Sequence, residues 1–118
     1  MTMIFRGRCW KFGDNICIDG DIMSTEFLNK RIFDPSVLSH HIFEELNPDM
    51  SRQVRPGDIV VAGKRFAHGN PHVLGFLGMK GAGLGLVTES IPRGAFRNAV
   101  FAGVPILPSC PDITHLVN

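Results

Sequence analysis

The residue types best suited to chemistry gather in the loop 63–72. Its chemistry-bearing side chains are Lys64, Arg65, His68, Asn70 and His72. The loop follows an apolar strand at 59–63, and Asn70 and Pro71 are typical of a helix start. Ligands of α/β folds bind beyond the carboxyl ends of strands, and a helix N-terminus attracts anions. The loop therefore predicts a binding site for a carboxylate or a phosphate.

Each of these residues also has a purely structural interpretation. Asn70 fits a plain helix N-cap, and Lys64 and Arg65 fit a solvated rim. His68 and His72 stand four residues apart, which is the spacing of a zinc-binding pair on one helix. Glycine, asparagine and proline lie between them, so the pair does not share a helical face. We therefore expect no metal site in this chain.

A second group of cations lies further along the chain. Arg93 and Arg97 are four residues apart in a predicted helix and so share one face. If that face points toward the loop 63–72, the two guanidinium groups could hold a second carboxylate through paired hydrogen bonds. The alternative is ordinary surface charge.

Strands and helices that alternate along the second half of the chain would position these groups. The pattern predicts a strand at 59–63, a helix from 70 to 80, a strand at 84–88, a helix at 93–102 and a strand at 104–107. This order favours an α/β fold with a mostly parallel core sheet. Upstream, we expect a strand at 4–12 and a helix that begins at Asp34 and Pro35. Leu38, Ile42 and Leu46 would form the apolar stripe of that helix.

Composition narrows the classes of function. The chain has 118 residues, 44% hydrophobic and 19% charged, with a net charge of +1. That charge gives no support to nucleic-acid binding, and no apolar run is long enough to span a membrane. A cytoplasmic location follows as the default expectation. Cys9, Cys17 and Cys110 show no metal-binding spacing, so we expect no cofactor bound by this chain alone.

Three collinear motifs resemble the small subunit of 3-isopropylmalate dehydratase, the swivelling domain of the aconitase superfamily. They are WKFGDNI at 10–16, RPGDIVVAG at 55–63, and a pattern that runs from Ser90 through Arg93 and FRNA at 96–99 to GVP at 103–105. The resemblance extends over about 5–108, most of the chain. It implies a swivel-type β/β/α domain at 1–108, followed by a C-terminal tail at 109–118.

The resemblance also implies partners and chemistry. Such a domain closes over a larger subunit that carries a 4Fe–4S cluster, and the cluster acts as a Lewis acid on the substrate. The expected reaction is the reversible dehydration of a hydroxycarboxylic acid, as in leucine biosynthesis. The implied substrate is a small carboxylic acid, and neither nucleic acid nor membrane is an expected partner.

The departures from the family pattern fall in the catalytic loop. The family loop resembles GKNFGCGSSRE, whereas this chain has GKRFAHGNPHV at 63–73. The catalytic base serine of the family falls on Asn70, the next serine on Pro71, and the substrate-binding arginine on His72. An amide cannot replace a serine alkoxide as a base. Either His72 or His68 has therefore taken over proton transfer, which imidazole performs near neutral pH, or the ordinary reaction is lost.

The acidic motif near the N-terminus is altered as well. Cys17 and Ile18 replace the first two members of the family's Asp-Thr-Asp, and only Asp19 remains. Residues 23–34 occupy the family's substrate-selecting loop, so the substrate does not carry over. Two hypotheses stand. In the first, the chain is a hydro-lyase subunit with Lys64, Arg65, Arg93 and Arg97 binding substrate and with His72, His68 and Asn70 in the catalytic loop. In the second, it is a non-catalytic or regulatory relative that binds a carboxylate or a partner subunit.

Overall fold

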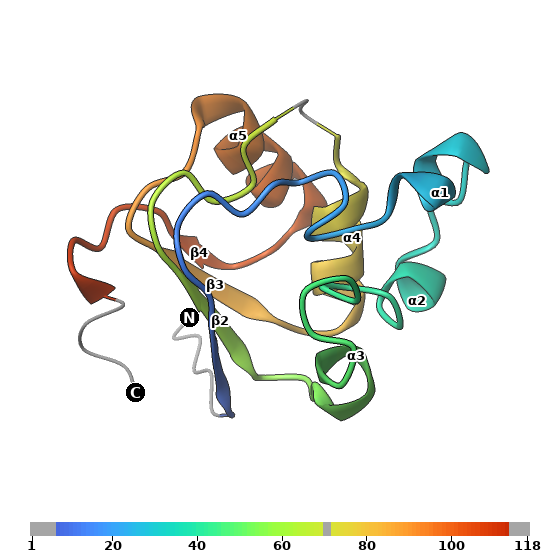
Figure 1. Cartoon of the computed structure of the whole chain (residues 1–118), viewed down its shortest axis with the longest axis horizontal. Helices are drawn as coiled ribbons and strands as arrows, with labels where there is room; N and C mark the ends of the chain where they lie inside the picture. Colours follow the sequence, from blue (N-terminus) through green and yellow to red (C-terminus); the bar gives the residue numbers. More distant parts are fainter. Residues whose placement is uncertain (1–6, 70–71, 114–118) are drawn as a thin grey trace.

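The computed structural model describes residues 7–69 and 72–113 (Figure 1). The elements along the chain are β1 (Cys9–Lys11), α1 (Thr25–Asn29), α2 (Pro35–Leu38), α3 (Met50–Gln53), β2 (Ile59–Ala62), α4 (Leu74–Gly81), β3 (Gly85–Thr88), α5 (Arg93–Ala102) and β4 (Ile106–Leu107). Strands and helices alternate from β2 onward, as the sequence predicts.

The four strands form one parallel sheet in the order β1-β2-β3-β4. Val60 pairs with Trp10 on β1 and with Leu86 on β3, so β2 lies between these two strands. The helix α4 connects β2 to β3, and α5 connects β3 to β4. The predicted α/β class with a mostly parallel core sheet is confirmed.

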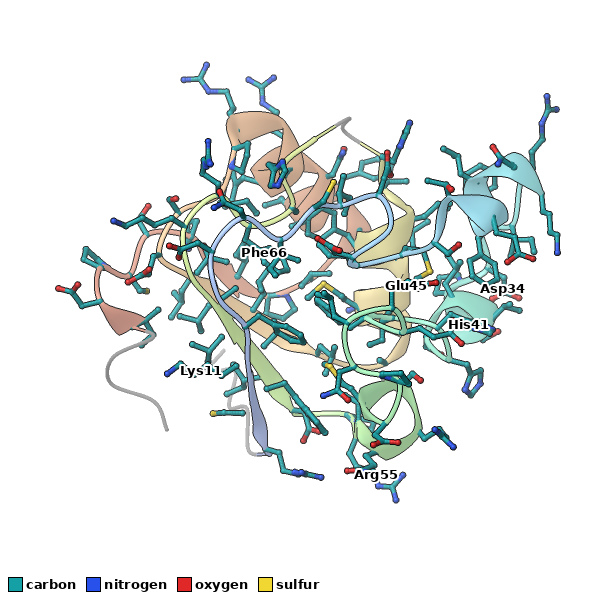
Figure 2. All side chains as sticks on the ribbon, in the orientation of Figure 1. Lys11, Asp34, His41, Glu45, Arg55 and Phe66 are labelled. Atoms are coloured by element: carbon teal, nitrogen blue, oxygen red, sulfur yellow. The ribbon has the colours of Figure 1, made fainter. Side chains whose placement is uncertain are left out.

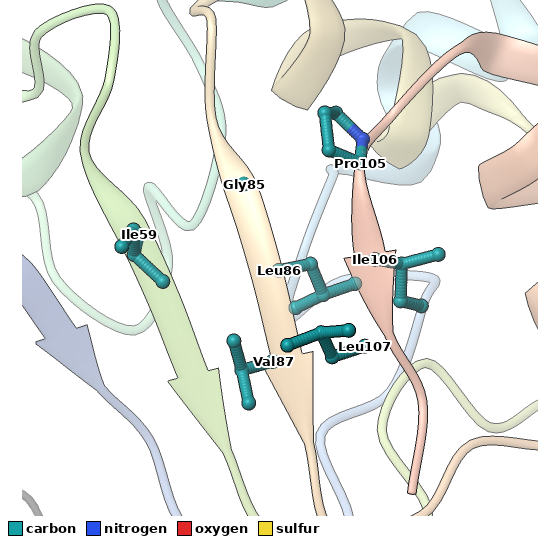
Figure 3. A pocket seen from close by; sticks show the side chains of 7 residues that line it. All are labelled: Ile59, Gly85, Leu86, Val87, Pro105, Ile106 and Leu107. Atoms are coloured by element: carbon teal, nitrogen blue, oxygen red, sulfur yellow. The ribbon is translucent and has the colours of Figure 1, made fainter. Parts of the chain in front are cut away.

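The helices cover one face of this sheet. Val60, Ala62 and Leu86 belong to a single core cluster that also contains buried residues of α4 and α5. Figure 1 shows α1 and α2 on the outer side of α4, and α3 below α4 near the start of β2. The opposite face exposes apolar side chains of β2, β3 and β4 around a shallow pocket of about 350 Å³ (Figure 3). The described residues thus supply one β layer and one helical layer of the β/β/α arrangement.

Glycines on α4 allow close packing against the segment that precedes β2. A Cβ at Gly75 would lie 2.6 Å from the Ile22 side chain, and one at Gly78 would lie 2.6 Å from Ile42. No side chain larger than hydrogen fits without movement at such distances. These glycines therefore face the 16–46 segment and not the sheet, and they set the distance between α4 and that segment.

Asp58 joins the start of β2 to β1. Its side chain is 2% exposed and accepts hydrogen bonds from the Arg8 backbone N–H at 2.9 Å, the Trp10 indole N–H at 3.0 Å and the Arg55 backbone N–H at 3.0 Å. Burial alone raises the pKa of the Asp58 carboxyl. The three hydrogen bonds, together with the charge of Arg8, outweigh burial and hold that pKa below its ordinary value of 3.8.

The helix predicted after Asp34 is much shorter than its apolar stripe suggests. Asp34 does cap α2, because its side chain accepts the Ser36 N–H at 2.9 Å, but the helix ends at Leu38. Further on, the Phe43 N–H donates to the Ile22 carbonyl at 2.8 Å instead of continuing a helix. A tertiary hydrogen bond has replaced the helical one, and Leu46 lies exposed.

The helices α4 and α5 differ in how closely they follow their predicted bounds. The helix α5 has the predicted bounds and ends at Gly103, which has the left-handed φ of 86° expected at that position. The helix α4 begins at Leu74, so the predicted start at Asn70 and Pro71 is wrong. Both of those residues lie outside the described ranges, but His72 and Val73 are not helical.

Candidate functional site

The loop 63–72 leaves the carboxyl end of β2 and runs alongside the segment 13–19. The Gly63 N–H donates to the Gly13 carbonyl at 3.1 Å, and the Lys64 N–H donates to the Asp14 carboxylate at 2.8 Å. Further hydrogen bonds follow from Asn15 to Lys64, from Ala67 to Ile16 and from Ile18 to His68, at 2.7 to 3.0 Å. The loop is therefore held in place by backbone contacts with a segment about fifty positions earlier in the chain.

Ser90 supports the same loop after the end of β3. Its hydroxyl accepts the Arg65 N–H at 2.9 Å, and its carbonyl accepts the Phe66 N–H at 3.1 Å. Phe66 is completely buried and points into the interior (Figure 2). The residues on either side, Arg65 and Ala67, have left-handed φ angles of 55° and 64°. The loop backbone is thus fixed by packing as well as by hydrogen bonds.

Two of the predicted site residues meet at Asn15. The Arg65 Nε–H donates to Asn15 Oδ1 at 2.7 Å, and His68 Nε2 lies 3.0 Å from the Asn15 carbonyl oxygen. A carbonyl only accepts, so this geometry places the His68 proton on Nε2. That tautomer leaves Nδ1 as the acceptor of the His68 ring.

His72 forms the second cluster, with Asp19. Its Nδ1 lies 2.9 Å from both carboxylate oxygens of Asp19, and both side chains are partly buried. An ionised carboxylate only accepts hydrogen bonds, so His72 carries a proton on Nδ1 and its Nε2 is the proton-accepting nitrogen when the ring is neutral. The pair has the form of a carboxylate that orients a general base.

A pocket of about 420 Å³ opens beside this pair. It is lined by Leu28, Phe33, His72, Val73, Leu74, Asn98 and Phe101. The lining combines the His72 imidazole with apolar side chains from α1, α4 and α5, and Phe101 is 83% exposed at its edge. The pocket on the sheet face contains none of the predicted site residues.

The remaining predicted residues are not drawn into either cluster. Arg93 and Arg97 are exposed on α5, as is the Lys64 side chain on the loop. The predicted role of all three as substrate cations stays a prediction. Asn70 lies outside the described residues, so its predicted place in the catalytic loop stays a prediction too.

Asp19 and Asn15 organise the site, and the spacing of the loop residues did not identify them. Asp14, Asn15 and Asp19 all belong to the stretch that matches the family's acidic motif, which was the available signal. Within 7–69 and 72–113, no three His, Cys, Asp or Glu side chains lie close enough to hold a metal ion. In the same ranges, no helix has the length and hydrophobicity needed to cross a membrane.

Comparison with known proteins places this geometry in a family. The chain is 35% identical over 119 residues to the isopropylmalate/citramalate isomerase small subunit of Methanocaldococcus jannaschii, a match that covers 100% of the chain and 68% of that relative. It is 39% identical over 116 residues to the 3-isopropylmalate dehydratase small subunit of Halothermothrix orenii, covering 98% of the chain and 68% of that relative. The chain belongs to the 3-isopropylmalate dehydratase small-subunit family.

Two further proteins are similar to the chain. The methanogen homoaconitase small subunit of Methanothermobacter thermautotrophicus is 38% identical over 95% of the chain and 65% of its own length. The crystal structure of 3-isopropylmalate dehydratase from Methanocaldococcus jannaschii matches with a TM-score of 0.76 and 31% identity, over 83% of the chain and 57% of that protein. The chain thus spans about two thirds of the length of these curated relatives. No protein-family model matches the sequence.

Proposed function

We propose that the chain is the small subunit of a hydro-lyase that reversibly dehydrates a hydroxycarboxylic acid together with a larger iron–sulfur subunit. The proposal rests on family membership and, above all, on the His72–Asp19 pair. This pair puts an oriented base at the position of the family's substrate-binding arginine, beside a pocket that opens to solvent. A cytoplasmic location and a domain boundary at residue 108 stay predictions.

His72 would transfer the proton in this reaction. Dehydration breaks a C–H bond next to a carboxylate and the C–O bond of the hydroxyl, and a C=C bond forms between the two carbons. The C–H proton passes to Nε2 of His72, and the resulting imidazolium is stabilised by Asp19. The hydroxide that leaves takes up a proton from solvent and departs as water, and the imidazolium later releases its own proton to solvent. In the hydration direction the same nitrogen returns the proton, so one residue serves both directions.

Arg65 would bind a substrate carboxylate at the neighbouring cluster. Asn15 Oδ1 accepts the hydrogen bond from the Arg65 Nε–H. The terminal Nη groups make no hydrogen bond with the residues that the structure describes. These groups remain for a carboxylate, which arginine binds through two parallel hydrogen bonds. Arg93 and Arg97 are the candidates for a second carboxylate.

The iron–sulfur cluster would reside on the larger subunit. Cys9, Cys17 and Cys110 are free thiols, and no group of three metal-binding side chains forms in the described ranges, so the side chains that the structure describes offer no ligand set for a cluster. When bound to its own subunit, the cluster supplies Lewis-acid stabilisation to the leaving hydroxyl group.

Reconstitution with the larger subunit tests the proposal. Hydration of the unsaturated acids derived from 3-isopropylmalate and citramalate would be followed by the loss of their ultraviolet absorbance. We expect His72→Ala to lower kcat by about a hundredfold or more, the usual contribution of a general base. Asp19→Asn should lower kcat while the protein stays folded. His40→Ala is the matched control, because His40 is exposed and lies outside the site.

The outcome also separates the two hypotheses. Full activity in His72→Ala would exclude His72 as the base. If the chain binds a carboxylic acid or a partner subunit but the complex shows no activity with any acid, the non-catalytic or regulatory role replaces the hydro-lyase. That second role is favoured by the loss of both the serines and the arginine of the family loop, which Asn70, Pro71 and His72 replace.

A further inference from the structure

One wall of the pocket beside His72 comes from a short helix with little support. The helix α1 contributes Leu28 to the lining. None of its five residues is buried, and Phe27 and Leu28 pack only partly against the core. The position of this wall therefore depends on a few specific contacts.

His41 makes one of these contacts from the turn that follows α2. Its ring lies against the Phe27 ring, with the centroids 4.7 Å apart and an interplanar angle of 38°. The His41 N–H donates to the Leu38 carbonyl at 3.0 Å, which ties the turn to the buried end of α2. Figure 2 shows the labelled His41 side chain beside α2. The ring thus connects α1 to the body of the domain.

Charged groups lie on both sides of the His41 ring. On its own turn, Nδ1 lies 3.1 Å from the Glu44 carboxylate. On α1, Glu26 pairs with Lys30 and is near enough to His41 for the charge of the imidazole to act on it. The hydrogen bond and the charge of Lys30 chiefly lower the pKa of Glu26, and the charge of His41 lowers it further. An imidazolium is also attracted to the face of an aromatic ring such as that of Phe27.

We propose that His41 is a positioning residue for α1, and that its protonation holds the Leu28 wall of the pocket in place. An imidazole changes charge between about pH 5 and about pH 8. Attraction to Glu44, Glu26 and the Phe27 ring is therefore present at the acidic end of that range and is lost as pH rises. The helix is held firmly at the acidic end and more loosely at the alkaline end. An effect of His41 protonation on catalysis rests on the proposed function. The positioning of α1 by His41 does not.

Amide hydrogen exchange on the isolated chain tests the positioning. The reporters are the amides of Lys30, Arg31 and Ile32, which donate to carbonyls of α1 at 3.0 Å. After correction for intrinsic exchange rates, we expect their protection factors to fall about two- to fivefold between about pH 5 and about pH 8, the effect of an exposed ion pair. The Leu86 amide in the sheet should show no such change.

Variants separate charge from packing. His41→Phe keeps a ring against Phe27 without a charge, so the protection of α1 should become independent of pH. Glu44→Gln should reduce the pH step, and His40→Ala, an exposed neighbour, should leave it unchanged. The proposal is overturned if the step persists in His41→Phe or is absent from the wild-type chain. Because His41→Phe keeps a ring at this position, it remains informative even if a smaller side chain at residue 41 prevents folding.

Activity measurements connect the helix to the site. In the reconstituted enzyme, KM should rise over the same pH range in the wild type but not in His41→Phe, with kcat equal in the two proteins. A complex without activity would contradict the proposed function and leave the exchange result intact. If the amide protection of α1 depends on His41 but KM does not, His41 affects only the stability of α1. That outcome would overturn its role at the pocket.

Discussion

Replacing Asp58 with asparagine tests how β1 is held to β2. One carboxylate oxygen takes the Arg8 N–H, and the other takes the N–H groups of Trp10 and Arg55. An amide keeps a single acceptor oxygen, so Asp58→Asn loses at least one of the three hydrogen bonds and turns the others from charged to neutral. Partly buried, charge-assisted bonds of this kind give an expected loss of about 2 to 3 kcal/mol in the free energy of unfolding.

Urea unfolding followed by tryptophan fluorescence would measure this loss. Trp10 is the single tryptophan of the chain and donates directly to Asp58. The expected loss corresponds to a fall of about 10 °C in Tm. Asp49→Asn is the control, since Asp49 is exposed and its carboxylate pairs with Arg52 on the surface, at 3.2 Å. A change below about 0.5 kcal/mol for Asp58→Asn would refute the reasoning, because that is the range of ordinary surface substitutions.

The pH dependence provides an independent check of the same carboxylate. The pKa of Asp58 is lower in the folded protein than its ordinary value of 3.8. Its stabilising contribution is therefore complete above that value and is lost as pH falls through the folded pKa. The difference in stability between wild type and Asp58→Asn should be constant near neutral pH and shrink below about pH 4. A difference that grows in acid would contradict the assigned hydrogen bonds.

Two core substitutions should also lower stability, as measured by urea unfolding. Gly78→Ala places a methyl group 2.6 Å from the Ile42 side chain and should cost about 1 to 3 kcal/mol despite the higher helix propensity of alanine. Gly13→Ala, with open space around it, should be nearly neutral, and equal effects at the two sites would refute the packing argument. Phe43→Ala removes a fully buried ring stacked on Phe12 at 4.6 Å and should cost about 3 to 5 kcal/mol; a loss below about 1 kcal/mol would contradict this.

The elements that the sequence predicts well are those whose signals are local. The β-branched run of β2 and the glycine that ends α5 act within a few residues, and both elements form where expected. The helix after Asp34 has an equally good local signal. It ends early because the Phe43 N–H binds the Ile22 carbonyl, which no pattern of neighbouring residues reveals.

The candidate site divides in the same way. The loop that contains His68 and His72 is predictable from its strand end and its residue types. The partner of His72 is not predictable in this way. Asp19 stands 53 residues earlier in the chain, and it is the one residue kept from the family's Asp-Thr-Asp. The two histidines look equivalent by spacing, yet one faces a backbone carbonyl and the other faces a carboxylate. Only the fold assigns them different tautomers.

The hydrogen bonds between the segment 13–19 and the loop 63–72 have a consequence for folding. Contacts between residues about fifty positions apart require a large loop of chain to close, and closing it costs entropy before any contact forms. The pairing of β1 with β2 spans the same loop of chain, so once this pairing has formed the two segments meet at little further cost. We therefore expect the site to assemble after the sheet, and we expect a change that weakens β1, far from any histidine, to disorder the site before it unfolds the helices.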